Sequence, residues 1–415
     1  MRKRIILCYL LSFIPFLGIS QANIHHGFKV PEDRVRIRIP FKLYDNLIVV
    51  PVKVNGGMEM NFIVDTGVQY PILTEKAIGD YLGLEYTREI VIYGRGSVDS
   101  IRALVVKDIN LELPGGVVSD FTQSFLVLEH DYLELEKNLG IDVYGVLGYD
   151  LFKRFVVRID YEEGYITLIE PEAFKPRRRF TKVPIKVINT KPYMTVTIKD
   201  GENAEVTQPL MVDTGASHSI LLDPQHDDII VPEINVASVI GRGLAGDFYG
   251  FLGRVDAIQV DEFEINKTIA TFPDPNTTPE TVKRGSKYGT LGGEFLSRFD
   301  VIIDYHNEGI YLKKNRYYDS HFEHDMSGLY IVANGRNGSR YENFEVSSVR
   351  ENSPAHLAGI QKGDIIKTIN GLDYESIKLA GANAILREKP GKKIVVKIKR
   401  NDQKLRKVFR LERLI

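Results

Sequence analysis

Two aspartates stand in identical local sequences in this chain of 415 residues. The tetrapeptide Val-Asp-Thr-Gly occurs at residues 64–67 and again at 212–215, each time after an apolar run. If the two turns face each other, Asp65 and Asp213 form a pair in which one carboxyl keeps a proton and the other stays charged. Such a pair can take a proton from a bound water and donate one to a carbonyl oxygen.

A single Asp-Thr-Gly triplet is usually an ordinary turn, in which the aspartate bonds its own backbone. Here the flanks are repeated as well. Gly-Arg-Gly follows at residues 94–96 and 241–243, and the segment 145–155 is echoed at 289–299. Both echoes run into Ile-Asp-Tyr, so the chain contains an internal duplication of about 140 to 150 residues per copy. The duplication favours the aspartate pair.

These motifs resemble the retropepsin and pepsin group of aspartic proteases, and the continuation after residue 145 is similar to the bacterial retropepsin-like proteases in particular. The resemblance implies two closed β-barrel lobes, which we place at residues 35–172 and 180–315. Short apolar and β-branched runs bounded by Gly, Pro, Asn or Asp are in line with such mostly-β halves. The activity implied is hydrolysis of peptides or unfolded proteins, with no cofactor and no metal.

The resemblance also assigns supporting residues. Thr66 and Thr214 would lock the two turns through their hydroxyls, and Gly67 and Gly215 would let the backbone N–H groups approach the carboxylates. Ser217 would bond the outer oxygen of Asp213. The first copy has Gln69 at the matching position, so the two carboxylates are expected to be inequivalent, with Asp65 protonated.

Both Gly-Arg-Gly segments are predicted to be hairpin tips, because glycines between strand-like runs supply the dihedral angles of tight turns. In the family this position is the flap that closes over substrate. Gly94 and Gly96 are the candidates in the first copy, and Gly241 and Gly243 in the second. The alternative is a simple turn without substrate contact.

The C-terminal part is similar to a PDZ domain, which we place at residues 326–415. The resemblance rests on Ser-Pro-Ala at 353–355, Gly-Asp-Ile-Ile at 363–366 and Ile-Asn-Gly at 369–371. A PDZ domain binds C-terminal peptides as an added strand, with loop N–H groups holding the terminal carboxylate. The candidates for that loop are Gly328, Leu329 and Tyr330. Leu379 and Asn383 are candidates for the lining of the groove. The alternative for Leu379 is a position in the core.

Residues 1–22 have the pattern of a signal peptide: basic residues, an apolar stretch, and Ser20-Gln21-Ala22 as the cleavage site. The sequence therefore predicts an exported bacterial protein, either periplasmic or secreted. Cys8 is the only cysteine and lies in that stretch, so no disulfide is expected in the mature chain. No other stretch reaches the length of a membrane span.

The formal net charge of −1 gives no electrostatic reason to expect nucleic-acid binding. The basic run at residues 175–179 lies between the copies among prolines and is interpreted as a linker. His218, His226, His321 and His324 lack the spacing of metal ligands, and no metal site is expected.

The sequence thus predicts a mostly-β protein with two retropepsin-like lobes and a C-terminal PDZ domain, a β-sandwich with helices, acting as an exported aspartic endopeptidase. The alternative from another class is a non-catalytic peptide-binding protein of the cell envelope. A third reading, a structural envelope protein with decayed lobes, is weakened because both triplets are intact.

Overall fold

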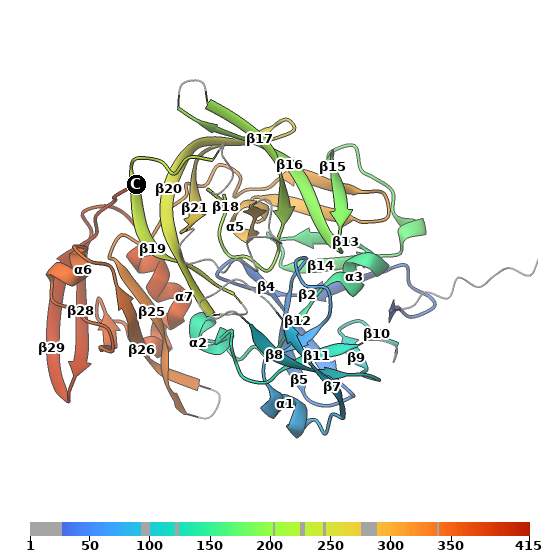
Figure 1. The fold of residues 1–415 in the computed structure, drawn as a ribbon, viewed down its shortest axis with the longest axis horizontal. Helices are drawn as coiled ribbons and strands as arrows, with labels where there is room; N and C mark the ends of the chain where they lie inside the picture. The colour runs from blue at the N-terminus through green and yellow to red at the C-terminus, as the bar shows by residue number, and fades with distance from the viewer. Residues whose placement is uncertain are drawn as a thin grey trace, which may run out of the picture.

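The computed structural model describes residues 27–92, 100–120, 124–201, 204–224, 229–243, 246–274, 289–337 and 340–415. The predicted signal peptide at 1–22 lies outside the described residues. Strands predominate, and the predicted mostly-β fold is confirmed. Figure 1 shows two β halves, with a smaller C-terminal module beside the second.

The first copy forms a sheet in which the strand that ends at the first aspartate, β5, lies at the centre between β4 and β12. The bounds of its strands are β1 (Phe28–Lys29), β3 (Lys42–Tyr44), β4 (Leu47–Val54), β5 (Glu59–Val64), β6 (Ile72–Leu73), β7 (Tyr86–Ile92), β8 (Ile101–Val106), β9 (Leu111–Leu113), β10 (Val117–Ser119), β11 (Phe125–Leu128) and β12 (Gly145–Leu147). Its helices are α1 (Lys76–Tyr81), α2 (Leu135–Leu139) and α3 (Tyr149–Arg154).

The second copy repeats this arrangement, because β17 pairs in parallel with β22 as β5 does with β12. Its elements are β15 (Thr181–Ile188), β16 (Lys191–Asp200), β17 (Ala204–Val212), β18 (Ile220–Leu221), β19 (Asn235–Gly243), β20 (Gly246–Val260), β21 (Phe263–Pro273), β22 (Thr290–Leu291) and α5 (Gly293–Leu296). Pairing of β20 with β16 closes a ring that runs through β17, β22, β18 and β21. In the first copy, no pairing among the described residues closes an equivalent ring.

One sheet joins the two copies. The strands that end in Ile-Asp from each copy, β13 (Val156–Asp160) and β23 (Phe299–Asp304), pair antiparallel, with Ile159 opposite Val301. The short helix η1 (Pro171–Ala173) follows in the connection between the copies. The other strands around this junction are β2 (Arg36–Pro40), β14 (Tyr165–Ile169) and β24 (Gly309–Lys314). A continuous cluster of buried apolar side chains extends through both copies, so they fold around a common core.

The C-terminal module has a five-strand sheet in the described residues, in the order β25-β26-β27-β28-β29, so β25 is an edge strand. Its bounds are β25 (Leu329–Asn337), β26 (Arg340–Val349), β27 (Ile365–Ile369), β28 (Lys393–Arg400), β29 (Gln403–Arg410), α6 (Pro354–Leu357) and α7 (Tyr374–Leu386). The Asp373 carboxylate caps the N-terminus of α7 by accepting from the N–H of Ser376 at 3.0 Å. The module has a hydrophobic core of its own.

Candidate active site

The two aspartates follow directly on the central strands of the two copies. The N–H of Asp65 donates to the carbonyl of Leu147 at 2.8 Å, and the N–H of Asp213 donates to that of Leu291 at 2.9 Å. Each bond extends the parallel pairing of the preceding strand by one residue, so the turns start from equivalent, rigid positions. The repeated sequence therefore has the same backbone geometry around each aspartate.

The two threonines join the turns reciprocally. Thr66 N–H donates to Thr214 Oγ1 at 3.0 Å, and Thr214 N–H donates to Thr66 Oγ1 at 3.1 Å. The hydroxyl of Thr66 then donates to the carbonyl of Val212 at 2.6 Å, and that of Thr214 to Val64 at 2.8 Å. All four bonds are buried and cross from one copy to the other, so they hold the aspartates side by side.

The glycines bring backbone against the carboxylates. Gly67 N–H donates to Asp65 Oδ1 at 2.6 Å, and Gly215 N–H donates to Asp213 Oδ1 at 3.0 Å. A Cβ on Gly215 would lie 2.2 Å from the Asp65 carboxyl carbon, closer than any real contact, whereas one on Gly67 would lie 3.0 Å from Asp65 Oδ1. The position of Gly215 therefore excludes any side chain.

The two carboxyl groups interact directly. Burial raises the pKa of Asp65 well above its usual value, and the neighbouring charge of Asp213 and a hydrogen bond between the two side chains raise that pKa further. The hydrogen bond from the N–H of Gly67 and the positive charge of Lys191 lower the pKa of Asp65. Burial is thus the largest cause of the raised pKa of Asp65, and the charge of Asp213 is the second. That Asp65 is the protonated member stays a prediction.

Two flanking residues differ between the copies. Ser217 lines the cavity above the pair, and its carbonyl accepts from the side-chain amide of Asn46 at 3.0 Å. Gln69 is exposed and is not among the residues that line the cavity. Ser217 and Gln69 therefore differ in exposure, whereas the hydrogen bond from Ser217 to Asp213 stays a prediction.

Sequence reasoning missed Tyr305, which ends the second Ile-Asp-Tyr segment. Its ring stacks on Phe152 with centroids 5.8 Å apart, and its hydroxyl is buried without a hydrogen-bond partner among the described residues. Burial raises the pKa of Tyr305, and the charges of Asp65 and Asp213 contribute. The repeated Ile-Asp-Tyr was a visible signal, but nothing in it indicated proximity to the aspartates.

A cavity of about 1190 Å³ opens above the pair. Its walls come from the first copy, from both strands of the β19–β20 hairpin, and from the C-terminal module. Representative lining residues are Asp65, Asp213, Lys191, Tyr193, Asn138, Ile240, Phe248, Tyr330 and Asn383. A volume of this size accommodates an extended peptide segment.

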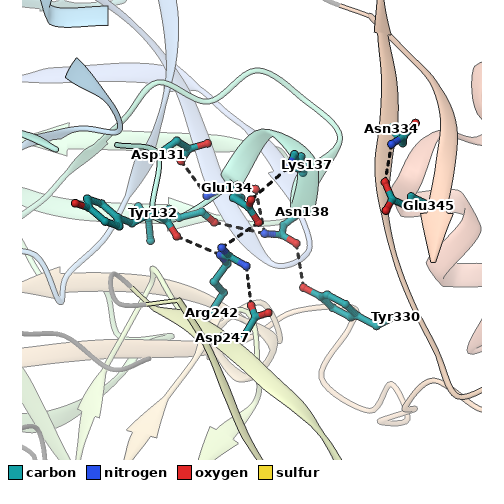
Figure 2. Close-up of polar contacts among 11 residues, drawn as sticks. Asp131, Tyr132, Glu134, Lys137, Asn138, Arg242, Asp247, Tyr330, Asn334 and Glu345 are labelled. Atoms are coloured by element: carbon teal, nitrogen blue, oxygen red, sulfur yellow. Dashed lines mark hydrogen bonds and ion pairs between the residues drawn. The ribbon is translucent and has the colours of Figure 1, made fainter. Parts of the chain in front are cut away.

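The second Gly-Arg-Gly lies at the end of the β19–β20 hairpin, where Gly241 pairs with Phe248 and Gly243 with Gly246. Figure 2 shows Arg242 reaching the first copy: it donates to the carbonyl of Tyr132 at 3.2 Å and pairs with Glu134 at 2.9 Å. The hairpin thus lines the cavity and its tip contacts the first copy, and its role as a flap stays a prediction. Gly94 and Gly96 lie outside the described residues.

The predicted carboxylate loop of the C-terminal module has internal partners. Gly328, at φ +81°, donates its N–H to Asp325 Oδ1 at 2.6 Å, and Leu329 donates its N–H to Ser327 Oγ at 3.0 Å. The Tyr330 hydroxyl donates to Asn138 Oδ1 of α2 at 3.0 Å (Figure 2). Leu379 is a core residue, and Asn383 faces the cavity.

No group of three or more His, Asp or Glu side chains suited to a metal ion occurs in the part of the chain that the structure describes. Within the same residues, no helix has both the length and the apolar character needed to cross a membrane. His226 lies outside the described residues, and His218 Nε2 contacts Thr290 Oγ1 at 2.6 Å.

Comparisons with known proteins find two similarities. The family model described as PDZ domain matches residues 345–400. A Retrovirus-related Pol polyprotein from transposon 412 of Drosophila melanogaster is 22% identical over 251 residues, which are 60% of this chain and 18% of that polyprotein. The chain thus spans less than a fifth of the relative's length. The predicted PDZ domain is confirmed over residues 345–400.

Proposed function

We propose that this protein is an aspartic endopeptidase that hydrolyses peptide bonds with a water activated by Asp65 and Asp213. The observation that carries the proposal is the set of four buried threonine bonds, because they hold two carboxyl groups in contact at the floor of a peptide-sized cavity. The similarity of 251 residues of this chain to a Retrovirus-related Pol polyprotein also supports a proteolytic activity.

In this mechanism the two carboxyl groups have different tasks. Asp213 in its charged form takes a proton from a water that lies between the pair and the substrate carbonyl. Asp65, which keeps its proton because it is buried, donates to the carbonyl oxygen as the water adds to the carbon. The tetrahedral intermediate then breaks its C–N bond: the nitrogen takes the proton from Asp213, and one hydroxyl group returns its proton to Asp65 as the new C=O bond forms, which restores the pair.

The proposal predicts that Asp65→Asn and Asp213→Asn each lower peptide cleavage by at least about 1000-fold, since each removes one half of the proton transfer. The mature protein and both variants would be incubated with a diverse peptide pool at several pH values, with and without pepstatin, and new termini identified by mass spectrometry. The rate should fall as the pH rises through the raised pKa of Asp65, because the acid is then lost. Cleavage near the wild-type rate in either variant would exclude the pair as the catalytic group.

A second candidate is a non-catalytic peptide-binding protein, which the PDZ match favours because PDZ domains bind peptides. The same experiment separates the two functions. Peptides retained on the wild-type protein without new termini at any pH would favour capture over hydrolysis. In that case both asparagine variants should retain peptides as well as the wild type does.

A further inference from the structure

The two copies place different side chains at equivalent points of the cavity wall. β4 and β16 each begin directly after a turn of two residues with positive φ, residues 45–46 and 189–190. The first residue of β4 is Leu47, and the first residue of β16 is Lys191. The same kind of turn therefore leads into each strand.

The register of the strands confirms that these two positions match. In each copy the third residue of the strand lies opposite the residue two positions before the aspartate. Leu47 and Lys191 therefore stand at the same place relative to Asp65 and Asp213, respectively.

Both Leu47 and Lys191 line the cavity above the aspartate pair. Leu47 is apolar and 7% exposed, whereas Lys191 is half-buried and carries a positive charge. Tyr193, two residues after Lys191, lines the cavity as well. Because the copies repeat around the aspartate pair, an extended substrate passes Leu47 on one side of the cut bond and Lys191 on the other.

Lys191 is close enough to the aspartates for its charge to act on them. Its charge lowers the pKa of Asp65, against the larger effects of burial and of the charge of Asp213. Since electrostatic interactions weaken with distance, a substrate side chain next to the cut bond is also within reach of Lys191.

The ammonium group of Lys191 is open to a ligand. Among the described residues, its Nζ has neither a hydrogen bond nor an ion pair. The arginines that line the cavity differ, because each interacts with a carboxylate: Arg242 with Glu134 and Asp247, Arg350 with Asp325, and Arg387 with Asp45. A lysine has three N–H donors, so a substrate carboxylate can accept a charge-assisted hydrogen bond from Lys191. An uncharged amide of the same shape gains a weaker bond.

We propose that Lys191 is a specificity-determining residue that selects an acidic side chain in the substrate, on one side of the cut bond and close to it. The inference rests on the proposed function and adds a substrate class to it: peptides with aspartate or glutamate at that position. Leu47 gives the matching position on the other side of the cut bond no such preference.

The test uses the mature protein and a peptide shown by the pool experiment to be cut. Each position near the cut bond is occupied in turn by the isosteric pairs aspartate and asparagine, and glutamate and glutamine, and kcat/KM is measured for every peptide. The enzymes are wild type, Lys191→Leu, which introduces the residue of the first copy, and Lys191→Glu. The control is Lys199→Gln on the same strand, because Lys199 pairs with Glu264 at 2.7 Å and does not line the cavity. In a parallel arm, the Kd of the same peptides is measured with the Asp213→Asn version of each protein.

At one position the acid should exceed its amide by about tenfold in kcat/KM for wild type and Lys199→Gln, as one charge-assisted hydrogen bond provides. The ratio should fall to near one in Lys191→Leu and below one in Lys191→Glu. Because each ratio compares two peptides on the same enzyme, a general change in activity through the aspartate pair cancels.

A ratio near one at every position in wild type, or a ratio that survives in Lys191→Leu, overturns the assignment while cleavage dependent on Asp65 still stands. A Lys191→Leu variant that changes the pH profile of cleavage but keeps the ratio would show that Lys191 acts on the aspartate pair alone, which also overturns it. If no peptide is cut, the proposed function fails, and the ratio of Kd values then decides the role of Lys191 by itself.

Discussion

The first and second copies hold their aspartates with the same backbone bonds but differ in how they enclose the cavity. In both copies the aspartate N–H donates to a leucine carbonyl, that of Leu147 or Leu291. The N–H of the next threonine donates to the threonine hydroxyl of the other copy. By contrast, β20 has 15 residues whereas β8 has 6, and among described residues the β19–β20 hairpin lines the cavity while β7 and β8 do not.

The paired tyrosines show the same contrast. Tyr161 packs edge-on against Phe41 of its own copy, with centroids 6.0 Å apart, and burial raises its pKa. Tyr305 instead packs on Phe152 of the other copy, and both aspartates contribute to raising its pKa. Residues that hold the carboxylate pair have the same type in both copies, because each one bonds its counterpart. Residues at matching positions with different neighbours have different contacts.

The largest expected effect tests the equality of the two turns. Gly215→Ala would place a methyl group on the Asp65 carboxyl group, whereas Gly67→Ala meets a looser contact. We expect Gly215→Ala to lower kcat by about 100-fold, since a displacement near 1 Å has that effect on catalytic groups. Gly67→Ala should have a clearly smaller effect, measured under identical conditions. Equal losses in both variants would show that the turns adjust symmetrically.

The second prediction concerns the threonine bonds, which should be equivalent. Thr66→Val and Thr214→Val each keep the side-chain shape but leave a buried N–H and a buried carbonyl without their partners. Each variant should lose about 2 kcal/mol of unfolding free energy, measured by urea denaturation. Thr197→Val, at the exposed Thr197–Thr207 contact, serves as the control and should change stability by less than about 0.5 kcal/mol. A marked difference between Thr66→Val and Thr214→Val would contradict the reciprocity of the pair.

The smallest expected effect is a pH dependence of stability at a position where the two copies have different neighbours. Glu294, at the start of α5, is half-buried, and this burial raises its pKa to about 7. A carboxyl group with a raised folded-state pKa contributes stability that is complete below its unfolded pKa and is lost as the pH rises through the folded value. The wild type should therefore lose roughly 1 to 2 kcal/mol between about pH 5 and 8 relative to Glu294→Gln.

Denaturation midpoints across that pH range would measure the Glu294 effect. Asp150→Asn, the matched change in the first copy, should show the same sign, because burial also raises the pKa of Asp150. Parallel pH profiles for wild type and Glu294→Gln would mean that this carboxyl group is solvated in solution.

Much of the geometry around the aspartates could be predicted from the sequence, because a motif that occurs twice in matched contexts predicts two equivalent turns. The pairing of Asp65 with Asp213 follows from two Asp-Thr-Gly triplets in matched contexts, and the mostly-β fold follows from short apolar runs between turn residues. The PDZ domain was visible for a similar reason: its glycines and apolar residues have a characteristic order.

The remaining features depend on contacts between segments that have no local signature. Nothing near Asn138 indicates that it meets Tyr330 of the PDZ domain, and nothing near Arg242 indicates that it pairs with Glu134 of the first copy. Leu379 shows the limit most directly: a leucine on a helix fits a groove or a core equally well, and only packing places it in the core.

Because β13 and β23 pair in one sheet, the two aspartates should stay together when the protein is diluted. Because both copies belong to one chain and exchange backbone bonds along this sheet, the two carboxyl groups meet in a unimolecular process. Activity per molecule should then be the same at nanomolar and micromolar protein, whereas a pair assembled from separate chains would come apart. One chain also lets the two turns differ, as Gln69 and Ser217 do at matching positions.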